Sequence, residues 1–333
     1  MENRKFRVAL IGCGSIAPNH IQSLLTVENA RLVALCDLKP EKCTACIENF
    51  GLDAKIYTDY IEMYDKERPD AVHIATPHYL HAEMTIAALE RGINVFLEKP
   101  MCISTEQIEA IIEAEKKSTA RVCISFQNRF LSAVREALRI AEEDGGALTA
   151  NFTVFWQRSK EYYTSSGWRG TYATEGGGVM INQAIHSLDL ITQFMGKPVS
   201  VCATTSNHHL KGVIEVEDSC EGVIEFESGR SANFYATTSA NTRDYTAITV
   251  ITKNHILRIE PPELFVDGEH FPFDDEIAKI GKYCYGCGHF KIIPKFYDSI
   301  VSGEEMPVTT ESAQYAVRIL LAAYKSNDQK TII

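Results

Sequence analysis

The sequence contains no long apolar stretch, and none of its runs approaches the roughly 18 apolar residues that a membrane-spanning helix needs. Met1 to Lys5 lead directly into a short apolar run, without the hydrophobic core and cleavage site of a secretory signal peptide. Basic blocks are also absent, and 33 Lys and Arg residues against 44 Asp and Glu residues give a formal net charge of -11. This charge disfavours binding to nucleic acid and to anionic membranes. These absences predict a cytoplasmic protein that binds neither.

The composition also lacks the signature of intrinsic disorder, which combines few apolar residues with a high charge. Hydrophobic residues make up 45% of the chain and charged residues 23%, close to the average for folded proteins. At roughly 100 to 200 residues per domain, a chain of 333 residues favours two domains over one.

The ten cysteines need a separate explanation, because a reducing cytosol disfavours disulfides. Most of them lie in apolar runs, where a free thiol behaves as a small hydrophobic group. Two CxxC pairs, Cys43/Cys46 and Cys284/Cys287, have an internal spacing that suits zinc, but they are too far apart in the chain for a zinc ribbon or finger. The sequence therefore predicts buried thiols and no metal, with zinc at these pairs as the alternative.

The first 125 residues alternate short β-rich runs with segments of helical periodicity. Strands are predicted at 7–11, 31–36, 55–57, 71–75, 94–97 and 121–125. Helices are predicted at 16–26, 40–50, 79–91 and 105–117, with Gly51 and Gly92 at positions typical of C-terminal caps. This alternation predicts a doubly wound, parallel Rossmann sheet in a first domain, residues 1–125.

Residues 126–333 follow a different pattern and are predicted to form a second α/β domain. Helices are predicted at 130–143 and 179–195, and strands at 148–157, 223–227, 231–238 and 247–251 within a strand-rich region that spans 199–266. A final amphipathic helix is predicted at about 311–325, with Thr309 or Thr310 as its N-cap. The alternating strands predict a large open, mainly antiparallel sheet with one buried face.

A G-x-G-x-x-A motif follows the first predicted strand and opens a helix. It consists of Gly12, Gly14, Ala17 and the intervening residues Cys13, Ser15 and Ile16. Asp37 ends the second strand at the distance where a carboxylate accepts hydrogen bonds from the adenosine ribose. An ordinary strand-to-helix turn, with Asp37 as the N-cap of the next helix, is the alternative interpretation. Because a carboxylate repels a 2'-phosphate, the motif predicts NAD, with NADP less favoured.

Two further groups of polar residues lie where ligands of α/β sheets bind. Thr76-Pro77 and Glu98-Lys99-Pro100 end the fourth and fifth predicted strands. Asn182, His186, Asp189 and Gln193 recur at helical spacing after the triglycine 176–178. A solvated lysine and a solvated helix face are the alternatives, but the rest of this helix is too apolar to be peripheral.

Together these motifs resemble the glucose-fructose oxidoreductase and inositol dehydrogenase family (Gfo/Idh/MocA). The resemblance is carried by the 12–17 loop, the 76–81 segment, Glu98-Lys99-Pro100, the run 176–189 and Gly286-Cys287-Gly288-His289. It covers essentially the whole chain. It implies an N-terminal Rossmann domain and a second domain whose open sheet mediates assembly into a homodimer or homotetramer.

The resemblance also implies roles for individual residues. Lys99 and His186 would meet the reacting hydroxyl, His186 as the proton acceptor, and Asn182 would complete the catalytic group. Many members have aspartate in place of Asn182, and an amide there can only orient the His186 ring through a neutral hydrogen bond. The residues expected to bind the cofactor are Gly12, Gly14, Ser15, Ile16, Ala17, Asp37, Thr76, Pro77, His81, Glu98 and Lys99. Those expected to bind substrate are Lys99, Arg129, Tyr163, Trp168, Arg169, Asn182, His186 and Asp189.

The leading hypothesis is an NAD-dependent oxidoreductase that acts on a ring hydroxyl of a sugar, sugar acid, nucleotide sugar or cyclitol. Two alternatives stay open. One is a redox-neutral enzyme that processes glycosides while bound NAD cycles between its two states. The other is a non-catalytic, nucleotide-sensing regulatory protein of the same fold, which the loss of a carboxylate at Asn182 would allow.

Overall fold

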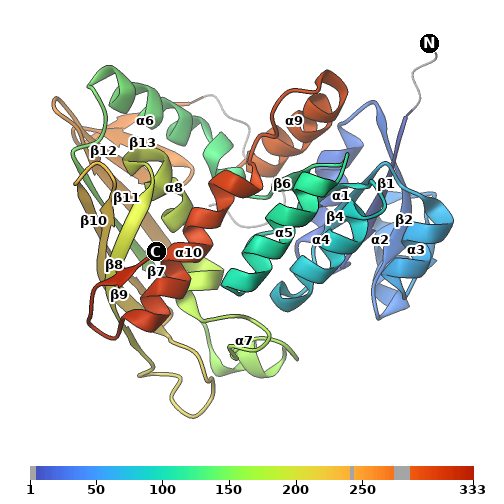
Figure 1. The fold of residues 1–333 in the computed structure, drawn as a ribbon, viewed down its shortest axis with the longest axis horizontal. Coiled ribbons are helices and arrows are strands. Elements are labelled where there is room, and N and C mark those ends of the chain that lie inside the picture. Colours follow the sequence, from blue (N-terminus) through green and yellow to red (C-terminus); the bar gives the residue numbers. More distant parts are fainter. Residues whose placement is uncertain (1–4, 241–243, 274–285) are drawn as a thin grey trace.

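The computed structural model of the protein describes residues 5–240, 244–273 and 286–333. Two β-sheets, each with its own helices, stand side by side (Figure 1). The first sheet is formed by the N-terminal part of the chain and the second by the C-terminal part.

The first sheet has six parallel strands in the order β3-β2-β1-β4-β5-β6. The strands are β1 (Phe6–Ile11), β2 (Ala30–Cys36), β3 (Lys55–Tyr57), β4 (Ala71–Ile74), β5 (Asn94–Leu97) and β6 (Val122–Ile124). Their apolar runs are buried because helices cover both faces, as expected for a parallel sheet. The order reverses between β1 and β4, and this is the position where such sheets bind ligands. The predicted Rossmann fold is confirmed.

The helices of this part are α1 (Ala17–Leu25), α2 (Pro40–Phe50), α3 (Tyr60–Glu67), α4 (His81–Leu89) and α5 (Thr105–Lys117), with a short 3₁₀ turn η1 (His78–Leu80). Four of them match the predicted helices within a few residues. Helix α3 was not predicted, although its N-cap, Asp59, accepts hydrogen bonds from the amides of Ile61 and Glu62.

The second sheet has nine strands in the order β14-β13-β12-β11-β7-β10-β9-β8-β15. They are β7 (Thr149–Phe155), β8 (Pro198–Ser206), β9 (Ser219–Phe226), β10 (Ser231–Thr237), β11 (Tyr245–Ile251), β12 (Ile256–Glu260), β13 (Glu263–Val266), β14 (Glu269–Phe271) and β15 (Thr331–Ile332). Strands β7 and β10 pair in parallel, and the other described pairs are antiparallel. The predicted mainly antiparallel sheet is therefore confirmed, with one parallel pair at its centre.

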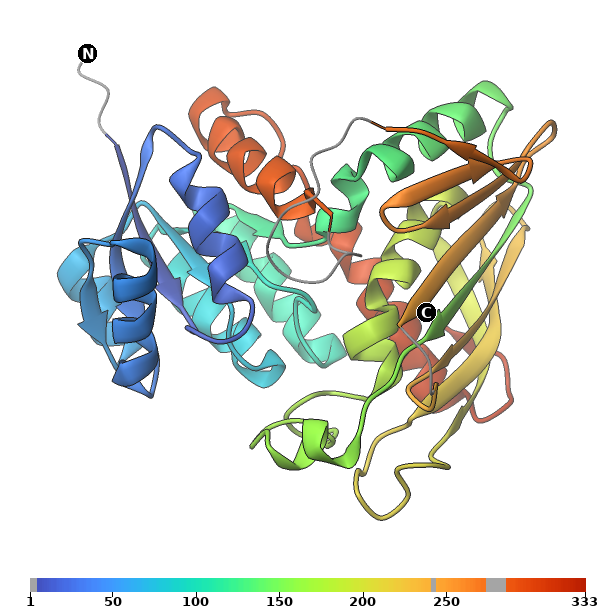
Figure 2. The ribbon, with the colours of Figure 1, turned by 180° about the vertical axis from the view of Figure 1, so that it is seen from behind.

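Helices cover one face of this sheet and leave the other face open (Figure 2). They include α6 (Ser132–Glu143), α8 (Ile185–Met195) and α10 (Thr310–Ser326), which contact strands of the sheet. The remaining elements are α7 (Lys160–Thr164), α9 (Gly288–Ser302), the 3₁₀ turn η2 (Gln127–Phe130) and the π-helical turn η3 (Met180–Ala184). The predicted N-cap Thr309 does cap α10.

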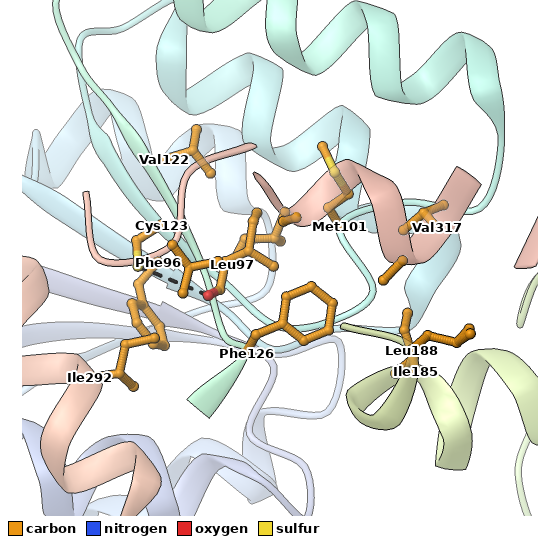
Figure 3. Packing of buried hydrophobic residues seen from close by; sticks show 14 of the residues in the cluster. Phe96, Leu97, Met101, Val122, Cys123, Phe126, Ile185, Leu188, Ile292 and Val317 are labelled. Carbon is orange, nitrogen blue, oxygen red and sulfur yellow. Dashed lines mark hydrogen bonds between the residues drawn. The ribbon is translucent and has the colours of Figure 1, made fainter. Parts of the chain in front are cut away.

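The two parts share one continuous hydrophobic core (Figure 3). Phe96 and Leu97 of β5 lie in the same cluster as Ile185 and Leu188 of α8 and Val317 of α10. This core fixes α8 against the carboxyl ends of the first sheet. The domain boundary at 125/126 stays a prediction.

The C-terminal part of the chain also returns to the first sheet. Helix α9 packs against α1, and the hydroxyl of Tyr297 is hydrogen-bonded to His73 Nε2 at 2.9 Å. The amide of Ile124 in β6 donates to the carbonyl oxygen of Val308 at 3.0 Å. These contacts close the first sheet at its β6 edge and under α1.

Candidate active site

A cavity of about 1510 Å³ lies at the carboxyl ends of the first sheet and extends to the second part of the chain. Single ligands commonly occupy pockets of about 300–1,000 Å³, so this cavity has room for two. Of the residues predicted to bind cofactor, all but Ala17 and His81 line it: Gly12, Gly14, Ser15, Ile16, Asp37, Thr76, Pro77, Glu98 and Lys99. Of those predicted to bind substrate, Lys99, Trp168, Arg169, Asn182 and His186 line it, and Arg129, Tyr163 and Asp189 do not.

The glycine loop between β1 and α1 leaves room for a ligand. Gly12 has a φ of +90°, and a Cβ there would lie 2.4 Å from the carbonyl oxygen of Ala75. A Cβ at Gly14 would meet no atom within 4 Å, so the space beside this residue is open. The first glycine is therefore required by packing, and the second by access to the backbone, as in dinucleotide-binding loops.

Asp37 at the end of β2 is held by two backbone amides. Its Oδ2 accepts from Cys13 N at 2.9 Å, and its Oδ1 accepts from Lys39 N at 2.9 Å. Each oxygen keeps a lone pair for a further donor. This fixed carboxylate and the open space at Gly14 fit a ribose and a pyrophosphate, so the residues present suit NAD.

The end of β5 places Glu98 and Lys99 in the cavity. Burial acts to raise the pKa of Glu98, but hydrogen bonds from His20 Nε2 (3.0 Å) and His289 Nε2 (3.4 Å) hold it well below its ordinary value. Lys99 Nζ donates to the carbonyl oxygen of Asn182 at 3.1 Å. Burial lowers the pKa of Lys99, while the neighbouring Glu98 opposes this effect.

The group formed by Glu98, His20 and His289 also resembles a metal site. Their possible ligand atoms lie within 4.8 Å of one another. The hydrogen bonds between them account for the cluster without an ion. Of the cysteines considered for zinc, Cys43 and Cys46 are buried in α2, and Cys43 Sγ lies 3.6 Å from Cys13 Sγ. Cys284 lies outside the described residues.

The triglycine turn before α8 is fixed by close packing. A Cβ at Gly177 would lie 1.9 Å from Tyr324 Oη, and one at Gly178 would lie 1.8 Å from the carbonyl oxygen of Glu217. The buried carboxylate of Glu217 accepts from the amides of Gly178 (2.9 Å) and Met180 (3.0 Å) and from Tyr324 Oη (3.0 Å). Burial raises the pKa of Glu217 to about 7. Glu217 was not singled out from the sequence, because it lies far from the turn that it binds.

His186 is half-buried and faces the cavity from α8. Its Nδ1 has no hydrogen-bond partner among the described residues. Burial lowers the pKa of His186 well below its ordinary value, and the nearby Lys99 ammonium acts in the same direction. The ring is therefore neutral at physiological pH and can accept a proton.

Asn182 does not orient His186 as expected from the sequence. Its Nδ2 donates instead to Glu175 Oε1 at 2.5 Å and to Tyr162 Oη at 3.3 Å. The other Glu175 oxygen, Oε2, accepts from Gly170 N at 2.6 Å. Burial raises the pKa of Glu175, while these hydrogen bonds and, more weakly, the charges of Arg169 and Lys99 oppose this increase. The acidic side chain next to the predicted catalytic residues thus comes from Glu175, which sequence analysis missed although it directly precedes the triglycine.

Arg129 and Asp189 bind each other rather than face the cavity, contrary to the prediction. Arg129 Nε donates to Asp189 Oδ2 at 2.8 Å and Nη2 donates to Oδ1 at 2.5 Å, and both side chains are buried. His186 and Asp189 both lie in α8, and three residues turn an α-helix by about 300° rather than a full turn, so the two side chains point in different directions.

Two other predicted residues lie behind the cavity wall. The His81 ring lies between the carbonyl oxygens of Pro100 (2.6 Å) and Thr76 (2.9 Å) and connects the turns after β4 and β5. Tyr163 is 4% exposed and packs in a small cluster with Leu210. His81 and Tyr163 therefore pack against residues that line the cavity but do not line it themselves.

None of the described helices is both long enough and apolar enough to cross a membrane.

Comparison with known proteins agrees with this geometry. Residues 6–126 match the family described as "Oxidoreductase family, NAD-binding Rossmann fold", and residues 133–258 match the "GFO/IDH/MocA C-terminal domain". The chain is 28% identical over 247 residues to D-glucoside 3-dehydrogenase of Escherichia coli (strain K12), a match covering 69% of each protein. It is 31% identical over 126 residues to inositol 2-dehydrogenase of Salmonella typhimurium, covering 37% of this chain and 38% of that protein.

Solved structures extend the similarity to the whole chain. The WlbA dehydrogenase of Bordetella pertussis, solved with NADH and UDP-GlcNAcA, superposes with a TM-score of 0.84 at 26% identity, covering 100% of this chain and 99% of that one. Levoglucosan dehydrogenase with NADH and levoglucosan gives a TM-score of 0.88 at 21% identity, covering 99% of this chain and 100% of that one, and shows the shared fold. This chain therefore belongs to the Gfo/Idh/MocA family of oxidoreductases, with an N-terminal NAD-binding Rossmann fold.

Proposed function

We propose that the protein transfers hydride between NAD and a ring carbon bearing a hydroxyl group in a sugar, sugar acid, nucleotide sugar or cyclitol. The observation that carries this proposal is that Lys99 and the neutral His186 ring line the same cavity as the glycine loop and Asp37. The similar proteins named for a glucoside, for inositol and for a complex with UDP-GlcNAcA support this range of substrates.

The two residues divide the work that the oxidation requires. The carbinol carbon loses a hydride and its oxygen loses a proton, and bound NAD⁺ supplies the hydride acceptor. His186 accepts the proton, since its depressed pKa keeps the imidazole neutral. The Lys99 ammonium binds the same oxygen and stabilises the negative charge that develops there.

The proposal is tested by adding NAD⁺ and a panel of pyranoses and inositols to the purified protein and following nicotinamide absorbance. Lys99→Ala and His186→Ala should each lower kcat by about 10²-fold or more, the scale of a lost acid or base, while NAD affinity changes only a few-fold. His270→Ala is a matched control, because His270 is an exposed histidine in β14. Near-normal turnover by His186→Ala would show that the base is elsewhere.

The same assay separates the two alternatives. A redox-neutral enzyme would process a glycoside without net formation of NADH. A sensor would bind NAD and turn over no member of the panel. The neutral, unpartnered His186 Nδ1 next to Lys99 favours catalysis, since sensing requires neither group.

We also propose that two copies associate through the open face of the second sheet. Phe155, Tyr235 and Tyr245 form an aromatic cluster on neighbouring strands, with Phe155 5.7 Å from Tyr235 and 6.1 Å from Tyr245 between ring centroids. Tyr235 is 38% exposed, and Val223 of the neighbouring strand β9 is 43% exposed. Light scattering should give the mass of a dimer or tetramer, and Tyr235→Asp should shift it toward the monomer.

The division into residues 1–125 and 126–333 and a cytoplasmic location also remain proposals. Expression of residues 1–125 as a separate fragment that folds and binds NAD would support the first, and fractionation of the host cell would test the second.

A further inference from the structure

The wall of the cavity that faces Lys99 is positively charged. The described residues that line it between positions 156 and 187 include Arg158 and Arg169 and no carboxylate. Both guanidinium groups are close enough to Lys99 to lower its pKa, although less than burial does. Since the whole chain carries a net charge of -11, this cluster is a local feature rather than part of a basic surface.

Aromatic rings hold the two guanidinium groups in place. Arg158 Cζ lies 4.6 Å from the ring centroid of Trp156 and 4.9 Å from that of Tyr162. Arg169 Cζ lies 4.6 Å from the Tyr162 centroid and 4.7 Å from that of Trp168. Such stacking fixes the planar guanidinium group while leaving its N–H edge free to donate.

Each of the two guanidinium groups has one N–H donor that no described residue accepts. The Nε of Arg158 and the Nε of Arg169 are both buried and have no hydrogen-bond partner there. The Arg158 side chain is 90% buried. Its Nη1 donates to the Gln157 carbonyl oxygen at 2.6 Å and forms an ion pair with Asp244 at 3.6 Å. The buried acid Glu175 accepts from Gly170 and Asn182, and among the described residues it forms no hydrogen bond or ion pair with either arginine. A buried N–H donor without a partner costs free energy, so these two Nε groups favour a ligand that supplies an acceptor.

Other lining residues have the opposite polarity. Gln127 Oε1, Asn128 Oδ1 and Gln183 Oε1 are buried acceptors without a partner in the described chain, and they line the same cavity. They suit the donor hydroxyl groups of a sugar ring. A molecule that satisfies both sets has several hydroxyl groups and one strongly accepting group.

We infer that the substrate is a sugar derivative carrying an anionic group, carboxylate or phosphate, which Arg158 and Arg169 bind through their unpartnered N–H groups. This inference rests on the proposed function and specifies its substrate class. Paired N–H donors match the geometry of carboxylate and phosphate oxygens, and a charged acceptor forms much stronger hydrogen bonds with them than a neutral hydroxyl does.

Calorimetry on the NADH-loaded protein tests the inference without requiring turnover. The ligands are D-glucose, D-glucuronate and D-glucose 6-phosphate, and D-galactose, D-galacturonate and D-galactose 1-phosphate. At least one anionic member should bind about 10-fold or more tightly than its neutral parent. Comparison of the uronates with the sugar phosphates shows which anionic group the site accepts.

Variants then assign the effect to the arginines. Arg158→Gln and Arg169→Gln should each weaken binding of the anionic sugar by about 10- to 100-fold and change binding of the neutral sugar less than about threefold. Arg169→Lys should fall between, because it keeps the charge and loses the planar fork. Arg135→Gln, an exposed arginine of α6, should change neither.

Each result has a definite meaning. Equal binding of neutral and anionic sugars, no binding of any anionic member, or anion affinity unchanged in both glutamine variants would overturn the inference. If neutral sugars are then oxidised with NAD⁺, the proposed function is supported and only the inferred anionic substrate is rejected. If anionic sugars bind through the arginines but no member of the panel reduces NAD⁺, the substrate class stands and the proposed function fails.

Discussion

Replacing Asn182 with aspartate should give the protein a new dependence of stability on pH. Asn182 Nδ2 donates to Glu175 Oε1 at 2.5 Å, so the substitution puts a carboxylate oxygen where a donor was. Glu175 is already largely buried, and burial raises its pKa. The two neighbouring carboxyl groups therefore cannot both ionise at low cost.

The separation sets the scale of this effect. Two unit charges 2.5 Å apart repel by about 7 kcal/mol at an effective dielectric constant of about 20. The pair avoids this by keeping one proton, which raises its upper pKa. The folded variant then holds a proton that the unfolded chain releases above about pH 4.5, so its free energy of unfolding falls as pH rises. One retained proton gives a slope of about 1.4 kcal/mol per pH unit up to the raised pKa.

Urea unfolding of the wild-type protein, Asn182→Asp and Asn182→Ala between about pH 5 and pH 8 measures this slope. The alanine variant loses the hydrogen bond that lowers the Glu175 pKa but adds no second carboxylate, so its deficit relative to wild type should grow with pH much less than that of the aspartate variant. The deficit of the aspartate variant should grow with pH. A constant deficit in the aspartate variant would refute the arrangement of Asn182 and Glu175 described above.

Three other substitutions test separate parts of the structure. Asp37→Ser should lower the ratio of NAD to NADP affinity, measured by fluorescence titration, because it removes both the acceptor for the ribose and the repulsion of a 2'-phosphate; an unchanged ratio removes Asp37 from the site. Gly177→Ala should lower both thermal stability and kcat, because its Cβ would lie 1.9 Å from Tyr324 Oη, and wild-type melting would contradict that contact. Asp189→Asn should cost about 3–5 kcal/mol in denaturant unfolding by leaving the buried Arg129 without its carboxylate, with NAD affinity unchanged; normal stability together with weakened substrate binding would restore the predicted role in substrate binding.

Much of the fold follows from local patterns in the sequence. The apolar runs of the first sheet and the glycines after α2 and α4 locate its strands and helices within a few residues. Helix α3 could have been found from Asp59 and the acidic Glu62 in its first turn. The parallel pairing of β7 with β10 could not, because alternation shows which face of a strand is buried and not which strand lies beside it.

The site was predictable where function depends on a motif, and not where it depends on packing. Lys99 and His186 follow recognisable turns, and the structure brings them to one cavity. Helical spacing could not show that Asp189 turns to Arg129, because a buried acid looks the same in sequence whether it binds ligand or protein. Glu217 reaches the triglycine turn from a loop before β9, and only the tertiary structure brings the two together.

The return of α9 to the first sheet has a consequence for the order in which the chain can fold. The last contacts of that sheet, between Tyr297 and His73 and between Val308 and Ile124, come from residues near the end of the chain. During synthesis the first 125 residues therefore leave the ribosome long before the residues that cover the β6 edge and the surface beneath α1. Until those residues are synthesised, the β6 edge and the surface beneath α1 stay uncovered. An uncovered strand edge can pair with other chains, so rapid translation or a chaperone would protect the nascent Rossmann part.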